Sequence, residues 1–352
     1  MISLSRRLPA LAATVIAVCA SCSAPHQAAP EDSRWLVYPS GDGPGEGKRV
    51  VFVAGDEEYR SEESLPMLAR LMSAHHGFEC VVLFSQDPET GEIDPNHSSN
   101  IPGLHLIDEA DLLVLLLRFR ELPDQDMAKI MDHVEAGKPL IGMRTSTHAF
   151  NYKENKESPY AKWTWNSKSP AGGFGKAILG ETWVAHHGHH GKEATRGVQN
   201  PEHADHPTLR GVKDVFGTTD VYAIRDLPAN AQVLLNGSVL DGMTPDAQPV
   251  DGEKNNPMHP VAWLRQREVE TESGVVSQRI FSTTMGAAPD FSSLDLRKLF
   301  FNAAFWTLEM EKQIPEAGLK ADMIGTWSPT NFGFNSFRTG FHPADYRDGT
   351  PD

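Results

Sequence analysis

The residues most able to do chemistry are concentrated in one short histidine-rich segment. Six of the fifteen histidines lie between His186 and His206. The first four surround Gly188 and are followed by Gly191, which predicts a loop rather than a helix. Imidazoles at this density could hold a divalent metal, transfer protons, bind a hydroxylated ligand, or pack on nearby aromatic rings.

A metal site is one of these alternatives. Two histidines of the loop could supply ligands, and His148 with a carboxylate from Asp56 or Glu58 could complete an open zinc site. The spacing matches no standard zinc motif such as H-E-x-x-H. The sequence therefore leaves metal binding and proton transfer open.

The remaining members of the segment have plainer interpretations. His203 and His206 flank "AD" and precede a proline, a pattern that is typical of turns and predicts a structural role. Trp163, Trp165 and Trp183 offer aromatic faces on which either histidines or a sugar ring could pack.

Polar and charged residues also follow each expected strand of a sheet. They occur in "GDEEYRSEE", "RFRE", "RTSTHAFNY" and "TTMGAAPDF". The ligand crevice of an open parallel sheet lies at the carboxyl ends of its strands, so these residues should converge there. Glu58, His148, His186 and His190 are the candidates for acid–base catalysis, and the last three are also the candidate metal ligands. The candidates for substrate binding are Asp56, Tyr59, Arg118, Arg120, Arg144, Thr145 and Trp183.

The three arginines of this set could clamp oxyanions or sugar hydroxyls. The competing interpretation is that acidic and basic groups pair with each other across the sheet edge, which would still orient a polyol. A nucleophile of the usual kind is missing, because the segment around Ser146 contains neither cysteine nor G-x-S-x-G. Cys80 begins an expected strand and should be buried, so thiol catalysis is not expected.

Elements that could position these residues alternate along the first half of the chain. Apolar runs at 48–55, 79–85, 111–119 and 138–143 predict strands, and helical periodicity predicts helices at 64–76 and 124–137. This alternation predicts a doubly wound α/β fold with a mostly parallel sheet. Strand signals return at 231–240 and in a hairpin about Ser273-Gly274, before a helix from about Ser293 to Glu309.

The rest of the chain divides by composition. Residues 1–22 are expected to form a signal peptide and residues 23–47 a flexible tether. An α/β domain then spans 48–312, with a His- and Trp-rich excursion at 151–219. Residues 313–352 form an aromatic, Gly-rich C-terminal strap that either packs on the domain or edges a ligand groove or subunit interface.

The N-terminal residues predict export. Arg6 and Arg7 precede an apolar run that is too short to span a bilayer, and Ala20-Ser21-Cys22 has the form of a bacterial lipoprotein processing site. Processing there would leave a lipidated Cys22 and a protein in the periplasm or on the outer membrane, with the lipid as its one membrane contact. Ordinary cleavage nearby is the alternative. Cys80 would then be the remaining cysteine, so no internal disulfide can form.

Overall charge narrows the class of ligand. The chain has 47 acidic and 32 basic side chains, a formal net charge of −15. An acidic surface repels phosphate backbones, which argues against nucleic acid as a partner. Neutral ligands such as sugars are compatible with this charge, and the sequence leaves homo-oligomerisation open.

Several segments resemble the trehalose-utilisation (ThuA-like) family, in the form found in secreted proteins of planctomycete-like bacteria. They are "VFVAGDEEYRSEESLPMLARLM", "LLLRFRELPDQDM", "GKPLIGMRTSTHAFNY", "HPVAW" and "RIFSTTMG...LRKLFFNAAFWTLE". The resemblance spans about Lys48 to Glu311. It implies a flavodoxin-like fold similar to class I glutamine amidotransferases, without their cysteine. An H-x-G-x-H pattern of the family maps onto His186, Gly188 and His190.

The same resemblance implies action on a carbohydrate, glycoside or keto-sugar derivative. Together with the titratable residues it leads to the hypothesis of acid–base or metal-assisted hydrolysis, elimination or isomerisation. Zinc is the metal expected if the histidines bind one, and no other cofactor is predicted. A family histidine after the fourth strand matches Arg144 or His148. In the late T-x-L-G-H motif, however, Ala287 occupies the histidine position. This departure favours the rival interpretation, a non-catalytic carbohydrate-binding or scaffold lipoprotein that retains the fold.

Overall fold

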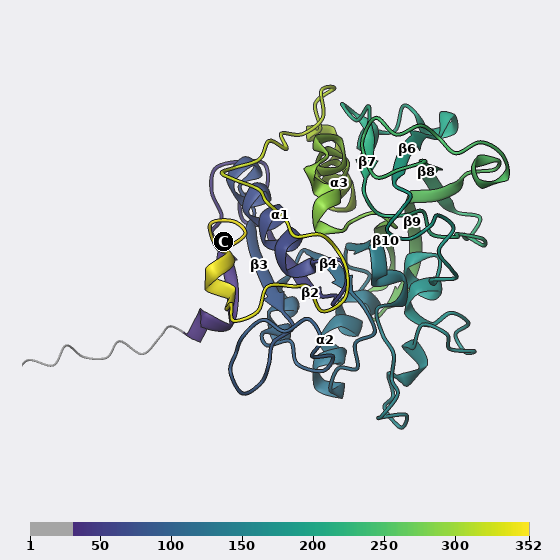
Figure 1. Cartoon of the computed structure of the whole chain (residues 1–352). Helices are drawn as coiled ribbons and strands as arrows, with labels where there is room; N and C mark the ends of the chain where they lie inside the picture. The colour runs from purple at the N-terminus through teal and green to yellow at the C-terminus, as the bar shows by residue number, and fades with distance from the viewer. Residues whose placement is uncertain (1–30, 352) are drawn as a thin grey trace, which may run out of the picture. The chain divides into compact units, whose positions relative to one another are not determined.

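The computed structural model of the chain describes residues 31–351 (Figure 1), and these form a single unit. The expected signal peptide and Cys22 lie outside the described residues. Within the described part, no helix is both long and apolar enough to cross a membrane.

Five parallel strands build one half of a ten-stranded sheet. They are β2 (Arg49–Gly55), β3 (Glu79–Phe84), β4 (Leu112–Leu117), β5 (Leu140–Met143) and β10 (Gly274–Thr283). Their spatial order is β3-β2-β4-β5-β10. Counted along the chain this is 2-1-3-4-5, the flavodoxin-like order. The expected fold class is confirmed, and the order reverses between β2 and β4.

The other half of the sheet is antiparallel. It consists of β9 (His259–Thr271), β8 (Ala231–Val239), β6 (Thr195–Gln199) and β7 (Val215–Gly217) beyond β10, and of β1 (Trp35–Tyr38) beside β3. The expected hairpin joins β9 to β10. The tight turn between β9 and β10 needs no crossover helix, so these two strands run antiparallel. The strands β1, β6, β7 and β8 also pair antiparallel with their neighbours, so the sheet is less parallel than predicted.

Two expectations about irregular segments are corrected. Residues 35–38 belong to the sheet rather than to a flexible tether, because the apolar side chains of Trp35, Leu36 and Tyr38 are buried there. The excursion at 151–219 also contributes β6 and β7 to the sheet, although most of it is irregular.

Helices cover both faces of the parallel half. Side chains of Val50 and Phe52 share a buried cluster with α1 (Ser61–His76) and α3 (Leu294–Thr307). The alternate residues Val51 and Val53 share the opposite cluster with α2 (Asp124–Glu135). Burial on both faces explains why these strands are continuous apolar runs, and it leaves their carboxyl ends as the open edge.

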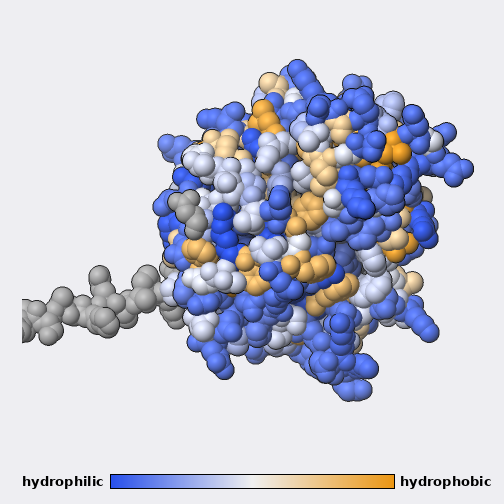
Figure 2. Space-filling model, in the orientation of Figure 1, coloured by the Kyte–Doolittle hydropathy of each residue, from blue (hydrophilic) through white to orange (hydrophobic). Residues whose placement is uncertain are grey.

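The C-terminal strap lies along this body, as drawn in yellow in Figure 1. Trp327 and Phe341 pack against the same cluster as α1 and α3, and the Tyr38 hydroxyl donates to the Arg347 carbonyl at 3.1 Å. The face seen in Figure 2 is mainly hydrophilic, with apolar residues single or in small groups.

Candidate functional site

Asp220 is the centre of a cluster at the carboxyl edge of the parallel strands. Its Oδ2 lies 2.7 Å from Nδ1 of His186, and its Oδ1 lies 3.2 Å from Nδ1 of His190. The Nε2 of His190 lies 3.2 Å from Oε1 of Glu58, which follows β2. The structure thus brings together Glu58, His186 and His190, as predicted, around a carboxylate that the sequence reasoning missed.

Backbone pairing explains how the histidine loop reaches Asp220. His186 and Tyr222 form an isolated antiparallel bridge, and the amide of His187 donates to the Val221 carbonyl at 2.8 Å. A Cβ at Gly188 would lie 3.0 Å from the Cβ of Asp220. The glycine therefore allows the close approach that places a histidine on each side of the carboxylate.

Arg144 fixes the position of Asp220 through hydrogen bonds. It is buried and adopts a φ of 42°. Its Nη1 donates to the carbonyls of Asp220 and Thr284, both at 2.7 Å, and its Nη2 donates to Oδ1 of Asp220 at 2.8 Å. These bonds occupy the guanidinium inside the protein, so Arg144 orients a site carboxylate in place of the expected substrate contact.

Electrostatics in the cluster follow from these contacts. Burial alone would raise the pKa of Asp220, but Arg144, His186 and His190 outweigh it and hold the pKa well below its ordinary value. Hydrogen bonds to Asp220 and then Glu58 raise the pKa of His190 to about 9. At neutral pH the cluster therefore contains the Asp220 carboxylate and a protonated His190 imidazole that lies between it and Glu58.

His148 lies beside this cluster in a cavity of about 40 Å³. The cavity is lined by Glu58, Arg118, Phe119, His148, Trp183, His186 and Tyr222. The Thr147 hydroxyl donates to the Arg144 carbonyl at 3.2 Å and lies 3.2 Å from Nδ1 of His148. The tautomer with its proton on Nδ1 donates to this hydroxyl and keeps the Nε2 lone pair for a ligand.

Burial, and then the charges of Arg118, Arg144 and His186, hold the pKa of His148 well below its usual value. The imidazole is therefore neutral. It can accept a hydrogen bond or act as a base, but it has no acidic proton to donate as a general acid at neutral pH.

Arg118 and Arg120 share Glu57 but differ in their surroundings. Arg120 is buried, donating to Glu57 and to the Pro95 and His97 carbonyls, which argues for a structural role. Arg118 lines the cavity, pairs with Glu57, and has its Nε 3.7 Å from Oε2 of Glu58. It is the arginine that remains placed to act on a ligand or on Glu58.

Three other expected substrate contacts are inside the protein. Asp56 accepts from the amides of Glu58 and Tyr59 and from the Thr145 hydroxyl, so it fastens the turns after β2 and β5 together. Burial, with Glu57 nearby, raises the pKa of Asp56 to about 6. The Tyr59 hydroxyl accepts from Nη2 of Arg144 at 3.2 Å. Asp56, Tyr59 and Thr145 are placed to support the site rather than to touch a ligand.

Trp183 lines the same cavity, with its ring centroid 5.6 Å from that of His148 and 5.8 Å from that of His186. His206 caps a short turn at Pro207–Leu209 and packs on Trp306, outside the cluster. Cys80 is buried, and burial raises the pKa of its thiol well above the usual value, which agrees with the expectation against thiol catalysis.

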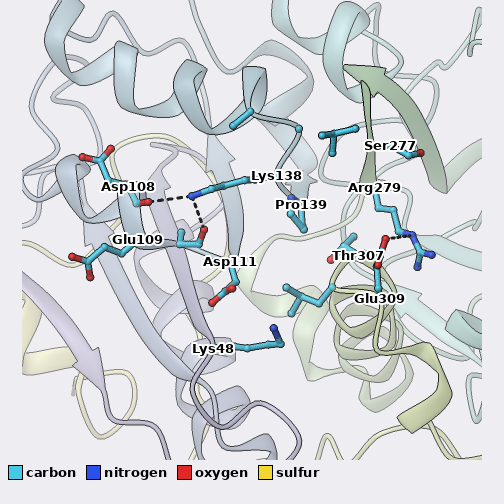
Figure 3. Close-up of a pocket in the computed structure, with 15 residues that line it drawn as sticks. Lys48, Asp108, Glu109, Asp111, Lys138, Pro139, Ser277, Arg279, Thr307 and Glu309 are labelled. Atoms are coloured by element: carbon cyan, nitrogen blue, oxygen red, sulfur yellow. Dashed lines mark hydrogen bonds and ion pairs between the residues drawn. The ribbon is translucent and has the colours of Figure 1, made fainter. Parts of the chain in front are cut away.

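A larger cavity of about 470 Å³ lies at the opposite edge of the sheet (Figure 3). It is lined by residues that precede β2, β4 and β5, including Lys48, Asp111 and Lys138. Lys138 donates to backbone carbonyls, and Arg279 pairs with Glu309 and Glu311. The charged side chains that line this larger cavity are largely paired with other groups. None of the expected catalytic residues lines it.

Asp220 carries no signal that sequence reasoning could use. It stands in "GTTDVYAI", outside any metal motif and 30 residues after His190. Backbone pairing between residues 185–188 and 221–223 brings it to the histidines.

Comparisons with known proteins give structural likeness only. No family model and no curated protein matches the chain. A crystal structure of a ThuA-like protein from Bacteroides uniformis is similar over 77% of this chain and 95% of its own, at 12% identity and a TM-score of 0.42. A second, from Parabacteroides merdae, is similar over 77% of this chain and 90% of its own, at 13% identity and a TM-score of 0.44.

Proposed function

We propose that this chain is a ThuA-like enzyme that acts on a carbohydrate, glycoside or keto-sugar derivative. In this proposal His186, His190 and Asp220 hold a divalent metal such as zinc, and Glu58 moves the proton. The observation that carries the proposal is the convergence of these four side chains, from three separate parts of the sequence, beside a cavity at the carboxyl edge of the sheet.

The donor set fits a metal. One ligand atom from each of His186, His190 and Asp220 lies within 4.8 Å of the others. Two imidazoles and a carboxylate are a common ligand set for zinc and other first-row metals that leaves positions open for substrate. Supporting groups are also present, because Arg144 orients Asp220 and Glu58 bonds to the outer nitrogen of His190.

Each remaining residue has a part in the proposed reaction. A metal at this site would polarise a carbonyl or hydroxyl oxygen of the ligand. Glu58 takes the proton released from the ligand or from water and returns it to the product, with Arg118 positioning its carboxylate. His148 accepts a hydrogen bond from a ligand hydroxyl through Nε2. Trp183 and Phe119 offer ring faces to a sugar.

The first test is metal content. Elemental analysis and calorimetric titration with Zn²⁺ should show one metal per chain, with affinity reduced at least about tenfold in His186→Ala and Asp220→Asn. His189→Ala is the matched control, since this neighbouring side chain is 71% exposed and pairs with Glu193. His148→Gln should leave the metal content intact; loss of metal in that variant would make His148 a ligand.

The second part of the test separates binding from catalysis. Glu58→Gln should retain the metal and lose turnover of 3-keto glycosides by about a hundredfold or more. No bound metal, no turnover, and unchanged sugar affinity in His186→Ala would together refute the enzyme and favour the non-catalytic carbohydrate-binding protein.

Export is proposed from the N-terminal residues alone. Mass spectrometry of the mature protein should find a lipidated Cys22 as its first residue. An unmodified first residue elsewhere would indicate ordinary signal cleavage.

A further inference from the structure

The cavity beside the cluster is too small for an organic substrate. Its volume is about 40 Å³, whereas one water occupies about 30 Å³ of liquid. Sites that bind small organic ligands usually enclose about 300–1,000 Å³. A sugar derivative therefore cannot enter this cavity in the conformation described, although His186 and His190 beside it are each 36% exposed.

The C-terminal strap contacts Arg118, which lines this cavity, and also His190 and Tyr59 of the neighbouring cluster. The ring of Phe332 lies 5.3 Å from that of His190 and 5.5 Å from that of Tyr59. The ring of Phe334 lies 4.9 Å from the guanidinium carbon of Arg118. In Figure 1 this part of the yellow segment crosses in front of β2 and β4. We name residues 330–338 the strap loop.

Hydrogen bonds and ion pairs tie the strap loop to the turn that carries Glu58. The Gly333 amide donates to the Glu58 carbonyl at 2.8 Å, and Nη2 of Arg60 donates to the Gly333 carbonyl at 2.6 Å. Glu63 accepts from the Thr330 hydroxyl at 2.8 Å and pairs with Arg338 at 2.9 Å. Thr330, Gly333 and Arg338 are partly exposed, whereas Arg60 and Glu63 are buried beneath the loop. Lifting the loop exposes these two side chains, so water can replace the partners that they lose.

No residue of the strap loop is buried, whereas buried residues farther along the strap in each direction hold it to the core. Ala321 and Tyr346 are each 1% exposed, and they anchor the strap to the core. Phe334, by contrast, is 52% exposed. Few buried apolar contacts mean a small free energy of local opening, so the middle of the strap can leave the surface while its ends stay in place.

We propose that the strap loop is a lid over the site, with Phe332 and Phe334 as the residues that close it and limit the size of the ligand admitted. The proposal rests on the function proposed above, for which it supplies the route of entry. Lid opening enlarges the cavity, and closure excludes water from the ligand.

Chemical modification of His148 tests the lid without substrate or metal. Diethyl pyrocarbonate acylates neutral imidazoles and is much larger than water. After trypsin digestion His148 is the single histidine of the peptide 145–153, so mass spectrometry can follow its modification. The exposed His189 in the same protein serves as the reference.

In the full chain as purified, His148 should react at least about tenfold more slowly than His189, because reaction requires opening. Phe332→Ala with Phe334→Ala should speed the reaction of His148 by about fivefold or more and leave His189 unchanged. Phe341→Ala is the matched control, since this strap phenylalanine packs on Tyr346 outside the strap loop. It should leave both rates unchanged.

Equal His148 rates in the wild type and the double variant would overturn the lid, as would an equal increase in the Phe341→Ala control. Circular dichroism confirms folding, and Phe334→Ala alone supplies the test if the double variant unfolds. The result is independent of the metal titration: the lid can fail while His186, His190 and Asp220 bind zinc, and the reverse.

Discussion

At the residue scale, the site depends on how Arg144 is held. A φ of 42° lies in the left-handed region, which is unfavourable for a side chain as large as arginine by about 1 kcal/mol or more. Three donated bonds to Asp220 and Thr284 compensate for this strain. The same residue that is strained in its backbone thus fixes the carboxylate on which both histidines converge.

Arg144→Lys should therefore damage the metal site although it keeps the charge. Lysine lacks the planar fork, so Asp220 loses an orienting donor and is left underpaired in a buried position. We expect affinity for Zn²⁺ to fall about tenfold and the free energy of unfolding to fall by about 3 kcal/mol. Calorimetry and urea denaturation measure the two effects.

Arg279→Lys is the control, because Arg279 also forms ion pairs but lies at the opposite edge of the sheet. It should leave zinc affinity unchanged. Unchanged affinity in Arg144→Lys as well would show that Arg144 does not position the ligand set.

At the element scale, the C-terminal end of α1 packs against the segment that joins β1 to β2. Gly77 terminates the helix with a φ of 80°, and its amide donates to the Ser73 carbonyl at 2.8 Å. A Cβ there would lie 2.6 Å from the Gly41 carbonyl oxygen. The glycine is thus required both by backbone conformation and by contact with the segment between β1 and β2.

Gly77→Ala should destabilise the protein by more than backbone strain alone. Gly47 has a similar φ of 77° with nothing within 4 Å of its added Cβ, so Gly47→Ala measures the strain, about 1 kcal/mol. Gly77→Ala should add roughly 1–3 kcal/mol for the forced shift of backbone. Equal losses in urea denaturation would mean that the 41–43 segment moves freely.

At the scale of the whole molecule, stability should depend on one buried carboxyl group. Glu62 is 1% exposed, neither of its carboxyl oxygens has a hydrogen-bond partner among the described residues, and burial raises its pKa to about 8. The folded state therefore holds a proton that the unfolded chain releases near pH 4.5. This contribution to stability is complete below about pH 4.5 and is lost as the pH rises to about 8.

Glu62→Gln should remove this dependence, since an amide of similar shape carries no proton to lose. Urea denaturation at pH 5 and at pH 9 measures the free energy of unfolding of both proteins. The wild type should lose several kcal/mol more than the variant between these two pH values. Asp87→Asn, at an exposed carboxyl, is the control and should leave the difference between the two pH values unchanged. A parallel pH profile for Glu62→Gln and the wild type would contradict the assignment.

The sequence by itself determined the parallel half of the fold and part of the site. Apolar runs and helical spacing located β2 to β5 and α1 to α3, because burial on both faces of a strand and on one face of a helix leaves a local pattern. The rule that parallel strands meet at their carboxyl ends then placed Glu58 and His148 at one edge.

Only the tertiary structure decided the rest. It paired the histidine loop with residues 221–223 and so brought in Asp220, turned Arg144 and Arg120 inward, added β1 to the sheet, and laid Phe332 over His190. Each of these depends on a contact between residues far apart in the chain, or on which way a polar side chain points. Composition and local periodicity indicate whether an apolar residue is buried, but they do not indicate which residues a polar side chain contacts. In this protein those contacts determine what the site can do chemically.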